Sequence, residues 1–190
     1  QQAIVVVPER SIGASFADEA LTQHGFYWDW QVAPQWNLCN APGIDEPRIA
    51  KSKVEAVKKF LASGDKLLVC THATFRFAVE ELGIQAFDNR LIAVDEFHHV
   101  SANPDNKLGS QLGAFMARDT VHVVAMTGSY FRGDSEAVLA PSDEGKFETV
   151  TYTYYEQLNG YRWLKSLDIG YFFYTGRYVD AVAKVLDPAL

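Results

Sequence analysis

Two adjacent acids, Asp95 and Glu96, directly follow the apolar run Leu91–Val94, and a histidine pair, His98 and His99, comes soon after them. A short apolar run of this kind is typical of a buried strand, so both carboxylates are predicted at the carboxyl end of a strand. Two uncompensated carboxylates would be costly to bury there, and a divalent cation with a polarised water removes that cost. One acid can then hold Mg²⁺, while the next orients or deprotonates an attacking water.

A second polar cluster, Thr127-Gly128-Ser129, follows the apolar run Val121–Met126. The two hydroxyls on either side of a glycine suit a hydrogen-bonding link between a nucleotide site and its surroundings. A tripeptide of this kind after a strand is most often an ordinary turn. Its place after the acid pair in the chain is what makes it a candidate for such a link.

Two earlier apolar runs, Ile4–Val7 and Lys66–Thr71, also end in polar residues. After the first run, Arg10 and Ser11 stand at a predicted helix start, where a cation and backbone amides can hold a phosphate. A capped helix with a surface arginine explains the same residues equally well. At the end of the second run, Thr71 can either cap a helix or contact a phosphodiester. Ligands of open α/β sheets bind outside the carboxyl ends of the strands, which makes all four strand ends candidates.

Strand-like and helix-like runs alternate along the chain, and this alternation predicts an α/β fold with a mostly parallel central sheet. Ser11 is the predicted N-cap of the first helix. The predicted helices cover Ser11–Gln23, Ala50–Ala62, Ala73–Leu82, Leu108–Ala117, Gln157–Leu167 and Thr175–Leu186, and further strands are predicted at Phe26–Val32, Thr149–Tyr154 and Tyr171–Tyr174.

The composition is that of a globular protein with a real core, since 48% of the 190 residues are hydrophobic and 22% are charged. No apolar run approaches the roughly 18 to 20 residues that span a bilayer, so no membrane partner is expected. The two cysteines, Cys39 and Cys70, are expected to be reduced thiols of a cytoplasmic protein. A net charge of −7 argues against tight nucleic-acid binding by this chain alone, because such binders usually carry a basic face.

Taken in chain order, the four strand ends resemble the motifs of superfamily 2 DExH-box helicases of the DEAD/DEAH kind. The sequence Asp95-Glu96-Phe97-His98, called the acid box below, resembles the DExH form of motif II. Thr127-Gly128-Ser129 looks like motif III. Pro8-Glu9-Arg10-Ser11 is similar to motif Ia, and Thr71-His72-Ala73-Thr74 is similar to the strand-edge motif that follows it.

This resemblance implies a role for each matched residue. Asp95 would bind the Mg²⁺ of ATP, and Glu96 would be the general base toward the hydrolytic water. His98 would couple the nucleotide site to the facing half of the enzyme. The remaining matches would be Thr127 and Ser129 in the same coupling, and Arg10, Ser11, Thr71 and Thr74 on the nucleic-acid backbone.

The resemblance also implies a three-layer RecA-like domain of the P-loop NTPase type, with its first strand and phosphate loop missing. Residues 1–190 would be a partial ATP-binding lobe that carries motifs Ia to III, and 150–190 would lead toward an absent second lobe. The complete protein would be an ATP-dependent helicase or translocase acting on DNA rather than RNA. Two departures matter: no Gly-x-Gly-Lys-Thr occurs, and Phe97 stands where Ala or Cys is frequent. The isolated chain is therefore expected to be inactive or nearly so.

Two other readings fit parts of the sequence. A metal-dependent hydrolase or nuclease could use a cluster of five side chains, namely His72, His98, His99, Asp95 and Glu96. A non-catalytic interaction module could instead present an aromatic stretch as a docking patch or base-stacking platform. The rings of that stretch could equally fill a core or cover an edge strand; they are Phe26, Tyr27, Trp28, Trp30 and Trp36.

Overall fold

The computed structural model describes residues 1–40, 47–99, 106–128, 138–153 and 155–156. The chain divides into two compact units, Gln1–Phe147 and Glu148–Leu190. All the strands of the described residues lie in the first unit, which also contains every site residue considered below.

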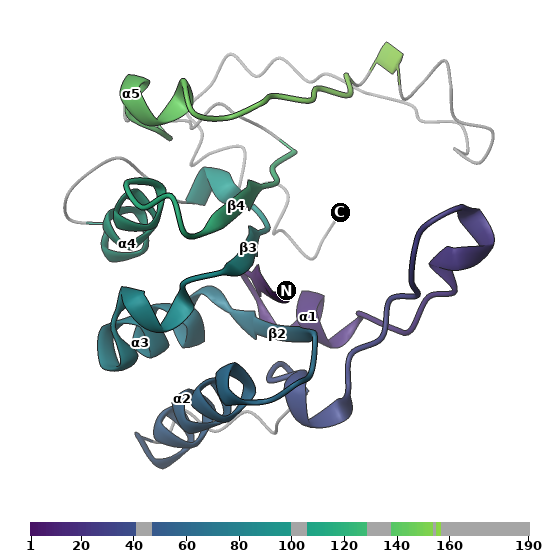
Figure 1. Ribbon diagram of the computed structural model, residues 1–190, viewed down its shortest axis with the longest axis vertical. Helices are drawn as coiled ribbons and strands as arrows, with labels where there is room; N and C mark the ends of the chain where they lie inside the picture. Colours follow the sequence, from purple (N-terminus) through teal and green to yellow (C-terminus); the bar gives the residue numbers. More distant parts are fainter. Residues whose placement is uncertain (41–46, 100–105, 129–137, 154, 157–190) are drawn as a thin grey trace, which may run out of the picture. The chain divides into compact units, whose positions relative to one another are not determined.

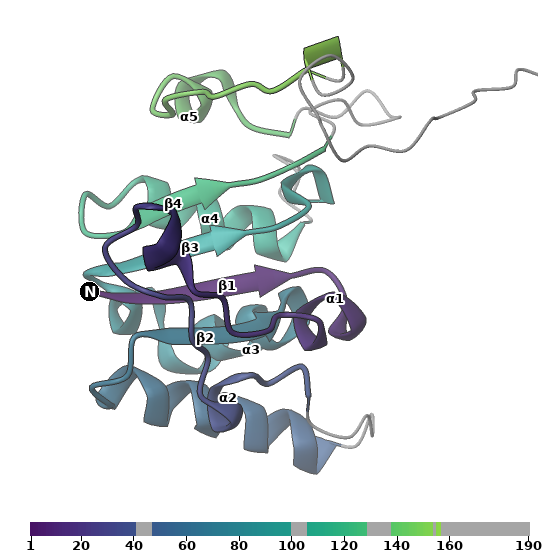
Figure 2. The same cartoon turned by 90° about the vertical axis from the view of Figure 1, so that its right-hand side faces the viewer.

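The described residues of the first unit contain four parallel strands, which form a sheet in the spatial order β2-β1-β3-β4. Figure 2 shows the four arrows pointing the same way, so their carboxyl ends lie at one edge. The predicted α/β class with a parallel central sheet is confirmed, and the arrangement is consistent with a RecA-like domain. The strands are β1 (Gln2–Val7), β2 (Leu67–Thr71), β3 (Arg90–Val94) and β4 (His122–Ala125).

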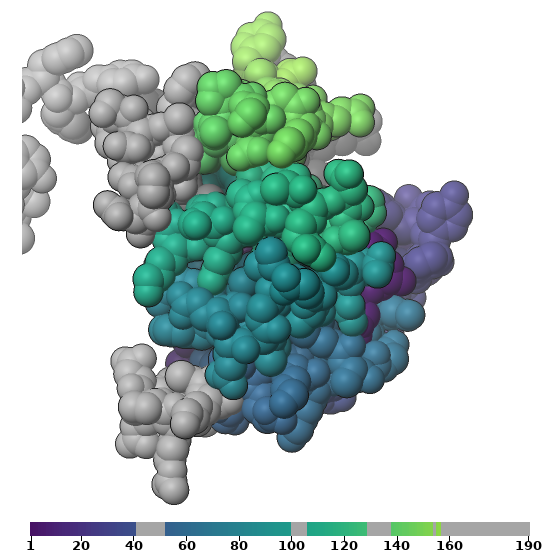
Figure 3. All heavy atoms as spheres, turned by 60° about the vertical axis from the view of Figure 1, so that its left-hand side comes forward, coloured from purple at the N-terminus to yellow at the C-terminus, as the bar shows by residue number. Residues whose placement is uncertain are grey.

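Three long helices cover one face of the sheet (Figure 1). They are α2 (Pro47–Ala62), α3 (His72–Leu82) and α4 (Lys107–Met116). Because side chains alternate along a strand, Ile4 and Val6 of β1 point into this core, while Val5 and Val7 point to the other face. The rings of Phe75 and Phe115 pack 6.0 Å apart between α3 and α4. Figure 3 shows these helices as a continuous layer of side chains.

The opposite face carries less regular cover, made by α1 (Arg10–Ala14) and the segment that follows it (Figure 1). Phe16 and Trp30 stack against this face with ring centroids 5.5 Å apart. The first helix is much shorter than predicted over Ser11–Gln23. Asn37 explains where it stops, because its Nδ2 donates to the Gly13 carbonyl at 3.0 Å and so satisfies a carbonyl at the helix end.

The predicted helix cap at Ser11 is wrong. Glu9 is the N-cap residue, and Ser11 lies inside the first turn with its hydroxyl donating to the Glu9 carboxylate at 3.3 Å. By contrast, Thr71 caps α3 as one reading of the sequence proposed, since its Oγ1 accepts from the Thr74 amide at 3.2 Å. The described helices α2, α3 and α4 and strands β1 to β4 match the predicted ranges to within a few residues.

Phe26–Val32 does not form the predicted strand. A single antiparallel bridge between Glu19 and Trp30 closes a loop that begins with the 3₁₀ helix η1 (Leu21–His24). The Asp29 carboxylate holds this loop by accepting from both the amide and the hydroxyl of Thr22, at 2.9 and 2.7 Å. Local side-chain hydrogen bonds of this kind compete with strand pairing.

The strand predicted at Thr149–Tyr154 is also wrong, since residues 149–153 have no regular structure and Val150 is 93% exposed. The elements predicted at Gln157–Leu167, Tyr171–Tyr174 and Thr175–Leu186 lie outside the described residues. Four shorter elements complete the described structure: η2 (Pro34–Trp36), η3 (Ile84–Phe87), η4 (Phe97–His99) and α5 (Pro141–Glu144). Within the described part of the chain, no helix is both long and apolar enough to cross a membrane.

Candidate functional site

The acid box leaves the sheet between β1 and β4, and backbone hydrogen bonds hold it on both sides. The Asp95 amide donates to the Val6 carbonyl of β1 at 2.9 Å. On the other side, the Phe97 amide donates to the Met126 carbonyl at 2.9 Å. The two acids are therefore placed at the carboxyl edge of the two central strands, where ligands of open α/β sheets bind.

Glu96 has a left-handed backbone conformation, with φ of 50°. A residue with a Cβ pays roughly 1–2 kcal/mol for this conformation, and such local strain is often found at functional sites. The side chains of Asp95 and Glu96 are both half-buried, so each retains access to solvent.

His98 links the acid box to the end of β4. Its Nδ1 lies 3.0 Å from Glu96 Oε2 and 2.9 Å from Thr127 Oγ1. One ring nitrogen thus faces a carboxylate from the β3 loop and a hydroxyl from the β4 loop. When Nδ1 carries a proton, it donates to the Glu96 carboxylate, which accepts only. His98 therefore lies between Glu96 and Thr127, and a coupling role for these residues stays a prediction.

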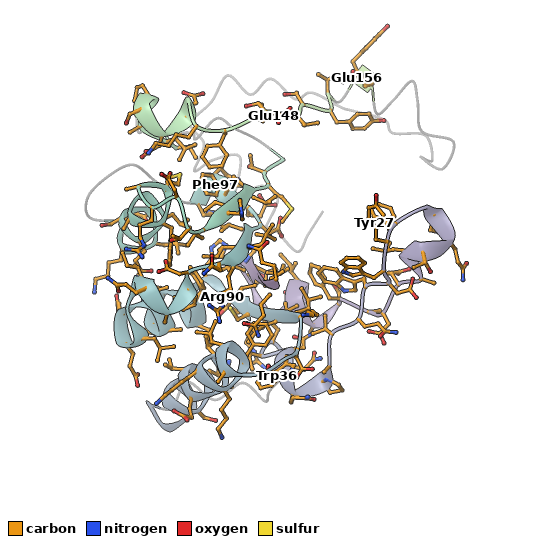
Figure 4. The ribbon with its side chains drawn as sticks, in the orientation of Figure 1. Tyr27, Trp36, Arg90, Phe97, Glu148 and Glu156 are labelled. Carbon is orange, nitrogen blue, oxygen red and sulfur yellow. The ribbon has the colours of Figure 1, made fainter. Side chains whose placement is uncertain are left out.

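Phe97, the bulky residue of the acid box, is a core residue. Its side chain is buried in the core beneath the sheet edge, and its ring lies 6.4 Å from that of Phe147 (Figure 4). The two neighbours Glu96 and His98 face the site, so burial of the ring between them anchors the loop. Phe97 serves packing in this chain.

His72, the first residue of α3, contacts the acid box from the β2 side. Its Nε2 lies 2.9 Å from the Asp95 carbonyl oxygen. A carbonyl can only accept, so this ring nitrogen carries the hydrogen. Burial lowers the pKa of His72 below its ordinary value of 6.5, against the opposing effect of the hydrogen bond to Asp95. In the sequence, His72 stands in the stretch Thr71-His72-Ala73-Thr74 and in the alternative metal cluster, and neither predicts a contact with the acid box. Its position at the first turn of a helix that follows a strand is the signal that could have indicated this contact.

Thr71 and Thr74 are both buried, at 9% and 7% exposure. The Thr71 hydroxyl donates to Thr74 Oγ1 at 3.1 Å, in addition to accepting from the Thr74 amide. These two predicted nucleic-acid contacts therefore use their hydroxyls to start α3. Their contact with a nucleic-acid backbone stays a prediction.

Arg10 and Ser11 start α1 at the carboxyl end of β1. The Arg10 guanidinium is half-buried, and its Nε and Nη2 both donate to the Cys39 carbonyl at 3.3 Å. Ser11 is exposed. The two residues lie at the same sheet edge as the acid box, and a role on nucleic acid stays a prediction for both.

Thr127 is brought into the site by His98, whereas Ser129, its predicted companion, lies outside the described residues. Among the described residues, no group of three or more His, Cys, Asp or Glu side chains could hold a metal ion. Cys39 and Cys70 are both free and buried, as expected for reduced thiols.

The aromatic stretch separates into two parts. Trp36 is buried and its ring lies 5.5 Å from Phe60 of α2, and Trp30 is half-buried against Phe16, so these rings serve packing. The other three rings are exposed on the loop that η1 begins, where Figure 4 labels Tyr27. Their exposed fractions are 60% for Phe26, 94% for Tyr27 and 75% for Trp28.

Comparison with known proteins adds one relative. The chain is 50% identical over 187 residues to a protein of Bacillus subtilis (strain 168) named "Putative ATP-dependent helicase YeeB". The chain resembles a protein named as a helicase. The match covers 98% of this chain and 30% of that relative, so the chain spans less than a third of the relative's length. No protein-family model matches the chain, and no solved structure matches it.

Proposed function

We propose that this chain is the part of a superfamily 2 DExH-box helicase or translocase lobe that carries the ATP-hydrolysis box. The observation that carries the proposal is the acid box at the carboxyl edge of the two central strands, with His98 joining Glu96 to Thr127 at 3.0 and 2.9 Å. The similarity to a longer protein named as an ATP-dependent helicase supports it. The proposed domain is a partial ATP-binding lobe over residues 1–190, with 150–190 leading toward a second lobe.

Each residue of the box has a proposed task. Glu96 accepts a proton from the water that attacks the terminal phosphate of ATP, and its half-buried carboxylate is accessible for this. His98 and Thr127 report the state of the site to the facing lobe. The second hydroxyl of the Thr-Gly-Ser motif, Ser129, is proposed for the same coupling on the resemblance alone.

Asp95 fits the role of a Mg²⁺ ligand. It offers a half-buried carboxylate, and oxygen is the ligand type that Mg²⁺ prefers. Mg²⁺ is usually bound by one or two carboxylates together with substrate phosphates and waters, so the lack of a larger acidic cluster among the described residues agrees with this. When bound, the ion supplies neutralisation of charge on the phosphates. Two hydrogen bonds hold the backbone of Asp95, one from its amide to the Val6 carbonyl and one from His72 Nε2 to its own carbonyl.

The amides and lysine that grip the β- and γ-phosphates must come from elsewhere. The 190 residues contain no Gly-x-Gly-Lys-Thr sequence, and we propose that a region outside them provides it. DNA is the proposed polymer, contacted by Arg10, Ser11, Thr71 and Thr74 together with the second lobe. The net charge of −7 favours such shared binding over binding by this chain alone. The free cysteines favour a cytoplasmic location.

The test is ATP turnover by the longer protein that contains this chain, with and without single-stranded DNA or RNA. The proposal expects hydrolysis that DNA stimulates more strongly than RNA, and no turnover by the isolated 190-residue chain. Absence of any ATP hydrolysis by the longer protein contradicts the proposed activity. Robust turnover by the isolated chain contradicts the proposed need for an external phosphate loop.

A further inference from the structure

We infer that His72 is a positioning residue that orients Glu96 by holding the peptide group between Asp95 and Glu96. This inference rests on the proposed function, because Glu96 has a base to supply only if the site hydrolyses ATP. The sequence pattern by itself predicts no such task for His72. The position follows from one contact, the 2.9 Å hydrogen bond from His72 Nε2 to the Asp95 carbonyl oxygen.

That carbonyl belongs to the peptide plane that precedes Glu96. The plane's orientation and the φ angle of Glu96 are linked, and φ is 50° here, in the left-handed region. A non-glycine residue holds this conformation only where its surroundings stabilise it. The amide of Asp95 is already fixed by Val6, and the Phe97 amide is fixed by Met126, both at 2.9 Å. The bond from His72 fixes the group that lies between these two anchors.

The hydrogen bond from His72 therefore sets the direction of the Glu96 side chain. With its backbone turned this way, its Oε2 lies 3.0 Å from His98 Nδ1. If the Asp95–Glu96 peptide rotated, Glu96 would relax toward the common right-handed or extended regions, and its carboxylate would leave that contact. A general base has to be positioned accurately relative to the attacking water. Rotation of the Asp95–Glu96 peptide would therefore lower the rate of ATP hydrolysis more than the affinity for ATP.

His72 also joins two parts of the site. It directly follows Thr71, the buried cap of α3, in the segment proposed to contact nucleic acid. A shift of the first turn of α3 therefore moves His72 relative to Asp95. The structure gives a short physical route, through Thr71, His72 and the Asp95–Glu96 peptide, from a nucleic-acid contact to the hydrolytic base.

Two substitutions of nearly equal size separate hydrogen bonding from packing. His72→Gln keeps an N–H donor near the position of Nε2, and His72→Met fills similar space without a donor. In the longer protein, His72→Met is expected to lower kcat for nucleic-acid-stimulated ATP hydrolysis by about tenfold or more, which corresponds to about 1.4 kcal/mol of transition-state stabilisation. KM for ATP should change by less than about threefold, because the proposed role of His72 is to position Glu96 rather than to bind ATP. His72→Gln should restore most of the lost kcat.

Equal kcat for His72→Met and the unsubstituted protein overturns the inference, and so does equal loss in both variants. A longer protein that hydrolyses no ATP, even without substitution, instead removes the proposed function. The hydrogen bond is tested independently in the 190-residue chain by nitrogen-15 NMR of the imidazole. A ring with a proton on Nε2, and a shifted Glu96 amide signal in His72→Met, support the inference. A neutral ring with its proton on Nδ1 alone overturns it whether or not the protein is a helicase.

Discussion

Glu96 combines a proposed chemical task with an unfavourable backbone conformation. Its φ of 50° has a steric cost of roughly 1–2 kcal/mol for any residue with a Cβ. The cost is offset by the hydrogen bonds that hold Asp95 and Phe97 on either side. Glu96 thus has a strained backbone and a carboxylate that contacts the His98 imidazole. Strained backbone conformations of this kind are expected at functional sites, where the exact position of a side chain matters.

Substitution of Glu96 by Gly and by Ala measures this strain. Both changes remove the carboxylate and its contact with His98, but only Gly removes the steric conflict. We expect Glu96→Gly to be more stable than Glu96→Ala by about 1 kcal/mol. In ordinary helix or strand positions the order is reversed, because Gly has the larger entropy in the unfolded chain. Urea unfolding of the two variants gives the difference, and a more stable Ala variant would mean that the backbone is not strained at this residue.

At the scale of secondary structure, α3 is the helix that contacts the acid box through its first residue, His72. It starts at the end of β2, presents His72 to the acid box, and buries Phe75 and Ala78 in the core. Its start is fixed by the Thr71 side chain, which accepts from the Thr74 amide at 3.2 Å. The Thr71 cap therefore fixes where α3 begins and, with it, the position of His72 in the site.

Thr71→Ala should lower the free energy of unfolding by about 1 kcal/mol, since the first turn of α3 loses its side-chain cap. Thr71→Ser keeps the hydroxyl and is the matched control, with a smaller loss from the missing methyl group. Thermal or urea unfolding of the 190-residue chain tests both. Equal stability of Thr71→Ala and Thr71→Ser would show that the cap contributes nothing, and would leave the Thr71 hydroxyl available for nucleic acid.

The strands and helices that carry the site could be predicted because their signals are local. Leu91–Val94 is a buried apolar run, and Thr71 precedes an amphipathic helix, so both were found from the pattern. The early end of α1 depends on Asn37, which lies far along the chain and reaches Gly13 only in the folded state. The loop that replaces the strand at Phe26–Val32 depends on a side-chain contact between Thr22 and Asp29. Contacts of this kind are set by tertiary structure and leave no periodic pattern.

The candidate site could likewise be predicted only in part from the sequence. Strand ends placed the acids at one edge, but the approach of His72 to the Asp95 carbonyl required the strand order β2-β1-β3-β4, with β2 and β3 on either side of β1. A sequence motif covers one stretch of residues at a time, so the contact between His72 and Asp95 could not be predicted from the motifs. Phe97 was noted as a departure from the motif, and its burial against Phe147 gives the reason.

At the scale of the first unit, an ionic cluster at the amino end of β3 ties distant parts together. The Asp88 carboxylate accepts from Arg118 Nη2 at 2.7 Å and from Thr120 Oγ1 at 2.7 Å. Arg118 and Thr120 belong to the connection between α4 and β4. The Thr120 hydroxyl and then the Arg118 guanidinium hold the pKa of Asp88 below its ordinary value of 3.8.

This depressed pKa predicts a dependence of stability on pH. An acid whose folded pKa is lowered contributes stability above its unfolded pKa, and the contribution is lost as the pH falls through the folded pKa. Unsubstituted protein should therefore exceed Asp88→Asn in stability near neutral pH, and the difference should shrink below about pH 4. Urea midpoints over a pH series measure it, with Asp119→Asn at the exposed neighbouring acid as control. A difference that stays constant with pH would contradict the role of the carboxylate charge.

The central claim is that the acid box hydrolyses ATP with Glu96 as the base. Glu96→Gln keeps the size of the side chain and removes its capacity to accept a proton, and Glu55→Gln on the exposed side of α2 is a control. In the longer protein that contains this chain, ATP hydrolysis under saturating DNA and nucleotide binding would be measured for both variants. We predict that Glu96→Gln lowers kcat by about 10²- to 10⁴-fold while ATP binding persists, and that Glu55→Gln hydrolyses ATP normally. Turnover that survives in Glu96→Gln would contradict the account.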